Sequence, residues 1–111
     1  YGATAEFSVR QNAALVFNNE ELSAWLAPVL TEAAGEGNVN AGSPPTTVAE
    51  DFSYLSQEVP GVFYHLGGSK DGVDPATSPP NHSPTFDVNE ATLPVGVRAH
   101  VLSALRLLER G

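Results

Sequence analysis

The sequence contains no cysteine, and its five Lys and Arg residues are outnumbered by thirteen Asp and Glu. The lack of cysteine excludes disulfides, thiolate metal sites and cysteine nucleophiles within these 111 residues. The formal net charge of -8 makes nucleic acid and anionic membrane surfaces poor partners, because both are bound through clustered Lys and Arg. We therefore expect neither nucleic acid nor a membrane among the partners of this protein.

Long apolar runs are also missing, since no segment approaches the roughly 20 residues that a transmembrane helix requires. The hydrophobic share of 41% and the charged share of 16% are typical of a folded chain of at most one domain. The first residue is Tyr1 rather than Met, and no signal-peptide pattern follows it. We expect a cytoplasmic location, with secretion or a periplasmic location left open because a targeting segment of a longer parent would not be seen here.

Strand and helix patterns alternate along the chain. The alternation of apolar and polar side chains in ATAEFSVR predicts a strand, and apolar residues at helical spacing predict three helices. The expected elements are a strand over 3–10, a helix over 19–34, a helix over 47–59, a strand over 62–66, a long loop over 67–89 and a helix over 89–109. This order predicts the α/β class.

Several residues mark where the expected helices begin and end. Asn18 with Glu21, and Thr47 with Glu50, have the spacing of a capping box at a helix start. Gly35 ends the first helix, as glycine commonly does. The last helix carries one apolar stripe, formed by Leu93, Val97, Val101, Leu102, Leu105 and Leu108.

His82 is the histidine with the clearest chemical potential. It lies in the loop segment SPPNHSPTFDVNE (78–90), between prolines, with Ser83 and Asp87 near enough in sequence to orient an imidazole. A rigidly held imidazole is a suitable metal ligand, but a zinc or manganese site needs three or more ligands and nothing nearby supplies them. A metal ligand and an ordinary surface-loop histidine both remain open, whereas structural roles are favoured for His65 and His100.

Two other groups of residues contain the residue types of a catalytic site. Glu50 and Asp51 form a pair of neighbouring carboxylates, but both fall in the first turn of an expected helix, where acidic residues favour the helix dipole. A capping role is therefore favoured over direct chemistry. Ser83, His82 and Asp87 have the residue types of a catalytic triad, yet neighbouring loop residues seldom reach triad geometry, and the sequence has no G-x-S-x-G elbow.

The stretches AEDFSYLSQEVPGVFYHLGG and NHSPTFDVNEATLPVGV together resemble a known family. They are similar to the C-terminal part of the metal-dependent amidohydrolases and metallopeptidases of the aminoacylase and carboxypeptidase superfamily, in particular to the branch of hippurate hydrolases and other N-acyl-amino-acid amidohydrolases. The matching motifs, in family order, are Glu50-Asp51-Phe52, Val59-Pro60-Gly61, Phe63 to Gly67, His82 to Phe86 and Glu90 to Gly96.

The resemblance implies a domain arrangement. Residues 1–17 would be the last strand of an inserted lid domain, through which members often dimerise, together with the crossover. Residues 18–111 would be the C-terminal part of the α/β catalytic domain.

The resemblance also implies a site and a reaction. The intact protein would hold two divalent metal ions, zinc or manganese, and cleave the amide bond of small N-acyl amino acids or peptides with a metal-activated water. His82 would be a metal ligand, and Glu50, Asp51 and Ser83 would be candidates to contact the substrate or the groups around the metal. The general base and the remaining ligands would come from upstream, so the fragment alone is expected to bind no metal and to be inactive. A non-catalytic interaction domain and a degenerate member without metals are the alternatives.

Overall fold

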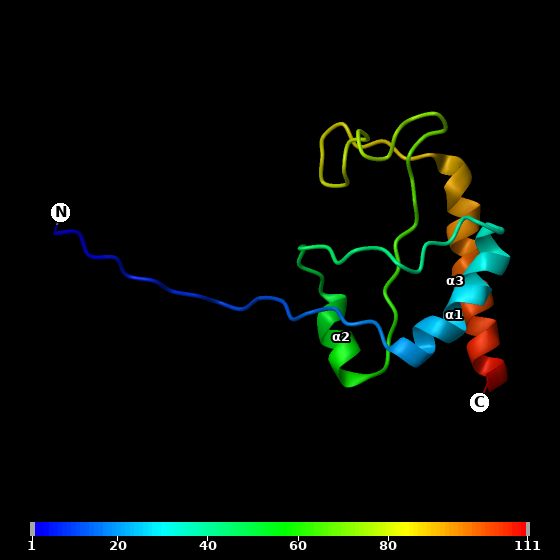
Figure 1. Cartoon of the computed structure of the whole chain (residues 1–111), viewed down its shortest axis with the longest axis horizontal. Helices are drawn as coiled ribbons and strands as arrows, with labels where there is room; N and C mark the ends of the chain where they lie inside the picture. Colours follow the sequence, from blue (N-terminus) through cyan, green and yellow to red (C-terminus); the bar gives the residue numbers. More distant parts are fainter. Residues whose placement is uncertain (1, 111) are drawn as a thin grey trace.

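The computed structural model describes residues 2–110 of the chain. Its elements, in order, are α1 (Glu20–Ala34), α2 (Phe52–Glu58), the short 3-10 helix η1 (Glu90–Thr92) and α3 (Leu93–Arg110). Helices α1 and α3 pack side by side, α2 stands apart from them, and the N-terminal residues run away from the body as a single extended trace (Figure 1). The radius of gyration is 18.2 Å, larger than the ~13 Å of a compact domain of this length, so much of the chain lies outside one core.

Helix α1 forms where the apolar spacing predicts it. The side chain of Asn19 accepts a hydrogen bond from the Leu22 N–H at 2.9 Å, and Glu20 and Glu21 occupy the first turn, where acidic side chains favour the helix dipole. At the other end Gly35 takes φ 91°, and its N–H donates to the Thr31 carbonyl. The predicted helix is confirmed, although its cap is Asn19 and not Asn18.

The core of the described residues is small and lies between α1 and α3. Its buried apolar side chains are Leu26, Val29 and Ala33 of α1 and Ala99 of α3. A cation–π contact and an ion pair lie at the edge of this contact: Arg110 stacks over the Trp25 ring at 5.1 Å and pairs with Glu21 at 3.0 Å. Such exposed pairs contribute little by themselves, so the burial of apolar surface is the main stabilising term.

Most of the apolar stripe of α3 is exposed, and of its members only Leu102 is half-buried. Leu93, Val97, Val101 and Leu105 are each more than half exposed, whereas Ala99 on another side of the helix is only 5% exposed and faces α1. The periodicity of the sequence identified an apolar side of the helix, but the one buried residue of α3, Ala99, lies outside this stripe. Among the described residues, no helix is both long enough and apolar enough to cross a membrane.

Helix α2 begins later than the capping-box pattern predicts. The Glu50 carboxylate accepts a hydrogen bond from the Phe52 N–H at 3.1 Å, and the Glu50 carbonyl accepts one from the Ser53 N–H. The first turn therefore starts beside Glu50, and the predicted start at Thr47 is wrong. Val48 is 70% exposed, so no apolar burial would stabilise an extra turn before Glu50.

The structure does not confirm the α/β class, because none of residues 2–110 forms a strand. In the segment 3–10 the expected inner face is open, with Phe7 88% and Val9 91% exposed. Residues 62–66 also lie outside any strand ladder. A strand is defined by hydrogen bonds to a neighbouring strand, and the described residues provide no such neighbour for either segment.

Side-chain hydrogen bonds hold residues 14–19 against α2 and the segment that follows it. The Asn18 side-chain amide donates to the Phe63 carbonyl at 2.9 Å and accepts from the Phe63 N–H at 2.7 Å. The buried Ser53 hydroxyl accepts from the Ala14 N–H at 3.2 Å. The Asn18 amide thus supplies to one residue the pair of bonds that a neighbouring strand would supply.

Candidate functional site

The loop over residues 67–89 is a chain of hydrogen-bonded turns. The N–H to carbonyl bonds that close these turns are Val73 to Lys70 (3.1 Å), Thr77 to Asp74 (2.9 Å), Ser83 to Pro80 (3.2 Å) and Phe86 to Ser83 (3.0 Å). The Asp74 carboxylate also accepts a hydrogen bond from the Ala76 N–H at 2.9 Å. Turn chemistry of Asp, Ser and Pro therefore orders this loop in the absence of helix or strand.

His82 occupies the third position of the turn closed by Pro80 and Ser83. Its φ is 69°, and among the described residues it is the one non-glycine residue with a positive φ. A positive φ at the third position is characteristic of type II turns, and histidine is among the side chains that adopt it more readily than most. The imidazole is exposed, so the turn presents it outward.

The two residues expected to orient His82 are engaged elsewhere. The Ser83 hydroxyl shares a hydrogen bond with the Thr85 hydroxyl at 3.0 Å and accepts from the Thr85 N–H at 3.2 Å. Asp87 pairs with Lys70, and this hydrogen bond and charge lower the pKa of the Asp87 carboxyl. The structure therefore does not assemble Ser83, His82 and Asp87 as a nucleophile set.

Glu50 and Asp51 lie at the start of α2. The Glu50 carboxylate binds the Phe52 N–H, as a helix-capping group does, while Asp51 is exposed and makes no capping hydrogen bond through its side chain. Within residues 2–110 no three His, Asp or Glu side chains come together in a group that could hold a metal ion. The imidazole of His82 is a donor that suits zinc or manganese, but the described residues supply it alone and do not complete a metal site.

A groove of about 540 Å³ runs between α1 and residues 62–67. The hydroxyls of Ser23 and Tyr64 are buried beside it without a hydrogen-bond partner among the described residues, and burial raises the pKa of Tyr64. The Phe63 ring meets the His65 ring edge-on, with 5.2 Å between their centroids. His65 thus has an aromatic packing partner, in keeping with the structural role favoured for it.

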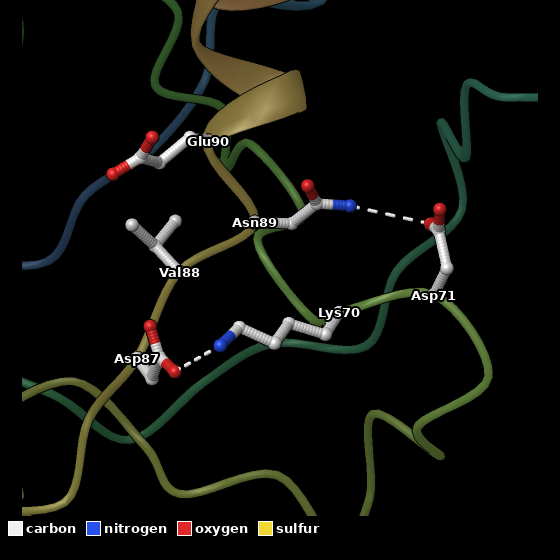
Figure 2. A pocket seen from close by; sticks show the side chains of 6 residues that line it. All are labelled: Lys70, Asp71, Asp87, Val88, Asn89 and Glu90. Atoms are coloured by element: carbon white, nitrogen blue, oxygen red, sulfur yellow. Dashed lines mark hydrogen bonds and ion pairs between the residues drawn. The ribbon is translucent and has the colours of Figure 1, made fainter.

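The two ends of the loop meet at a cluster that we name the loop neck, formed by Gly68, Lys70, Asp71, Asp87 and Asn89. Figure 2 shows the side chains of the last four. The Asn89 N–H donates to the Gly68 carbonyl at 2.8 Å, and the Asn89 side-chain amide donates to the Asp71 carboxylate at 3.2 Å. Lys70 and Asp87 form the second link. Sequence reasoning named Asp87 only as a neighbour of His82 and missed both pairings, because the paired side chains lie 17 and 18 positions apart, a spacing with no periodic signal.

A proline-flanked loop that is closed at its neck and presents one exposed imidazole is suited to deliver a single ligand or acid–base group to a site completed by other residues. The family model of "Peptidase family M20/M25/M40" matches residues 3–106, and the chain belongs to this family. The resemblance to amidohydrolases and metallopeptidases is thereby confirmed.

Relatives of this chain include plant and microbial hydrolases. It is 42% identical over 64 residues to "IAA-amino acid hydrolase ILR1-like 4" of Arabidopsis thaliana, covering 58% of this chain and 14% of the relative. It is 31% identical over 107 residues to "Thermostable carboxypeptidase 2" of Saccharolobus solfataricus, covering 96% and 26%. It is 32% identical over 97 residues to "Probable hydrolase sll0100" of Synechocystis sp., covering 87% and 24%.

The chain thus spans about a quarter or less of the length of these relatives. No solved structure matches it.

Proposed function

We propose that this chain is the C-terminal part of a metal-dependent hydrolase that cleaves the amide bond of N-acyl amino acids or small peptides. The observation that carries the proposal is the placement of His82, an exposed imidazole on a left-handed turn of a closed loop, in a chain of the M20/M25/M40 family. The names of the relatives, which include an amino acid conjugate hydrolase and a carboxypeptidase, support a small amide substrate.

His82 would supply one ligand to a centre of two zinc or manganese ions, and the remaining ligands and the general base would come from residues outside this chain. The bound metal would supply activation of the water that attacks the amide carbonyl. Within the chain, the turn of Pro80 to Ser83 would hold the imidazole in place, and Glu50, Asp51 and Ser83 would be the candidates for contact with the substrate or with groups around the metal.

The proposed domain arrangement has residues 1–17 as the last strand of a lid domain with its crossover, and residues 18–111 as part of an α/β catalytic domain. The exposure of Phe7 and Val9 supports a missing strand neighbour, and the open apolar stripe of α3 supports a missing packing partner. Dimerisation through the lid is part of the same proposal. The same exposed stripe would also serve a non-catalytic interaction domain, which the next experiment separates from the enzyme.

The test is His82→Asn in the intact enzyme of which these residues form a part. Asparagine tolerates a positive φ, so the turn should persist while the imidazole is lost. We expect metal affinity to fall about 10-fold or more, together with hydrolysis of N-acyl amino acids. His100→Asn removes an exposed imidazole from α3 and serves as the matched control, for which both measurements should stay unchanged. Wild-type metal content in His82→Asn would rule out His82 as a ligand.

A second experiment concerns the chain by itself. Because the described residues hold no group of three metal-binding side chains, the purified 111-residue chain should show no hydrolysis of N-acyl amino acids. Steady hydrolysis that a chelator abolishes would contradict the proposal that the rest of the site comes from other residues.

A further inference from the structure

We infer that Asn89, together with the ion pair of Lys70 and Asp87, positions His82 by closing the neck of its loop. The inference rests on the proposed role of His82 and extends it to residues that touch neither metal nor substrate. These are positioning residues, because they would act through the histidine that they hold in place.

Asn89 connects three parts of the chain. Its N–H and its side-chain amide bind Gly68 and Asp71 at the entrance of the loop, at 2.8 Å and 3.2 Å. Its side-chain oxygen accepts from the Ala91 N–H at 3.1 Å, and its carbonyl accepts from the Thr92 N–H at 3.0 Å. One residue therefore ties the entrance of the loop, its exit and the start of the last helix to one another.

A second set of contacts closes the neck beside Asn89. Lys70 and Asp87 pair across it, as Figure 2 shows. Next to this pair the backbone of Gly68 packs so closely against Val88 that a methyl group added at Gly68 would lie 2.9 Å from a Val88 methyl carbon. The two segments of the neck are thus in contact through hydrogen bonds, charge and van der Waals packing.

The turns between the two ends carry this constraint to His82. Hydrogen bonds close turns at 70–73, 74–77, 80–83 and 83–86, so most residues between the neck and the histidine lie within a hydrogen-bonded turn. Closing the ends of a loop restricts the region that its tip can explore. A ligand must be held to within a fraction of an ångström, and groups behind the ligand commonly provide that restraint.

The charges at the neck make it sensitive to one added carboxylate. A pocket of about 280 Å³ beside the neck is lined by three carboxylates and one cation, with Val88 and Asn89 completing it; the charged residues are Asp71, Asp87, Glu90 and Lys70. Asn89→Asp would place a carboxylate against Asp71, where the native amide donates a hydrogen bond. Because Asp caps helices as well as Asn does, the bond to the Ala91 N–H should survive.

The experiment uses the 15N-labelled 111-residue chain and compares Asn89→Asp with the exchanged pair Asp71→Asn/Asn89→Asp. In the single variant we expect the Ser83 and Phe86 amides to exchange with solvent about 10-fold faster, and the His82 imidazole signals to move toward those of an unstructured peptide. His65 and His100 signals should not move. The exchanged pair restores a donor opposite an acceptor and should return both readouts to wild type. Asn12→Asp, the same substitution at an exposed position outside the loop, is the control for amide exchange.

Three results would overturn the inference. The first is unchanged amide exchange and unchanged His82 signals in Asn89→Asp. The second is an effect that the exchanged pair fails to reverse, since this would assign the loss to the start of the last helix and not to the pairing across the neck. If circular dichroism shows that Asn89→Asp unfolds the last helix, variants that exchange the charges of Lys70 and Asp87 are used in place of the Asn89 variants. The single variant Lys70→Asp should then loosen the loop and Lys70→Asp/Asp87→Lys restore it, and failure of this second rescue is the third result.

Metal content separates this inference from the proposed function. In the intact enzyme Asn89→Asp should lower metal affinity by about 10–100-fold, and the exchanged pair should recover it. If the neck variants change the loop as expected while His82→Asn leaves metal content intact, the proposed ligand role fails and the role of the neck in ordering the loop stands.

Discussion

Asn18 offers the sharpest test of what holds the extended segments to the helices. Its amide donates to the Phe63 carbonyl at 2.9 Å and accepts from the Phe63 N–H at 2.7 Å. Asn18→Ala removes both bonds. A net contribution of about 0.5–1.5 kcal/mol for each hydrogen bond places the loss between about 1 and 3 kcal/mol, and the exposure of the pair favours the lower end.

The matched control is Asn40→Ala, in which the same side chain is lost from an exposed position that bonds only locally, to the Gly42 N–H at 3.0 Å. Its unfolding free energy should stay within about 0.5 kcal/mol of wild type. Asn18→Asp provides a further check, because it keeps the acceptor for the Phe63 N–H but turns a carboxylate oxygen toward the Phe63 carbonyl. Its loss should therefore match or exceed that of Asn18→Ala.

The assay is urea unfolding followed by circular dichroism and by the fluorescence of Trp25, the single tryptophan, which lies in α1. Unchanged slopes against denaturant would show that the variants alter stability and not the compactness of the unfolded chain. A loss in Asn18→Ala no greater than in Asn40→Ala would refute the reasoning that the amide replaces a strand neighbour.

Three further predictions concern the core and the loop neck. Lys70 lowers the pKa of Asp87, so the ion pair should contribute its full stabilisation above the unfolded pKa of about 3.9 and lose it as pH falls through the lower pKa of the folded state. An NMR titration of the Asp87 carboxyl should show this lowered pKa, and Lys70→Met should return it to its ordinary range. Ala99→Leu should cost about 1–3 kcal/mol in urea unfolding, because Ala99 is the buried residue of α3 and is only 5% exposed, whereas Ala104→Leu at an exposed position of α3 should cost less than about 0.5 kcal/mol. Gly68→Ala should cost at least ~1 kcal/mol and loosen the loop, because the new methyl would meet Val88 at 2.9 Å; Gly67→Ala, with nothing within 4 Å, should be nearly neutral in the same measurement.

Local sequence signals predicted the helices well and the start of α2 poorly. Glycine after Ala34 and asparagine before Glu90 act through bonds to residues a few positions away, so their effect can be read from the sequence. Helix α2 begins where Glu50 binds the Phe52 N–H, and Thr47 has the same capping chemistry three residues earlier. Choosing between the two depends on which residues are buried, which a local pattern does not contain.

The sequence by itself determined the family, the acidic character and the singular position of His82 between prolines. These properties depend on residue identity and on short-range order along the chain. Tertiary structure alone decided that most of the apolar stripe of α3 faces outward, that the segment 62–66 bonds to an asparagine side chain, and that Asn89 closes the loop. Each depends on a contact between residues far apart in sequence, and the energy of such a contact exists only when folding brings the two groups together.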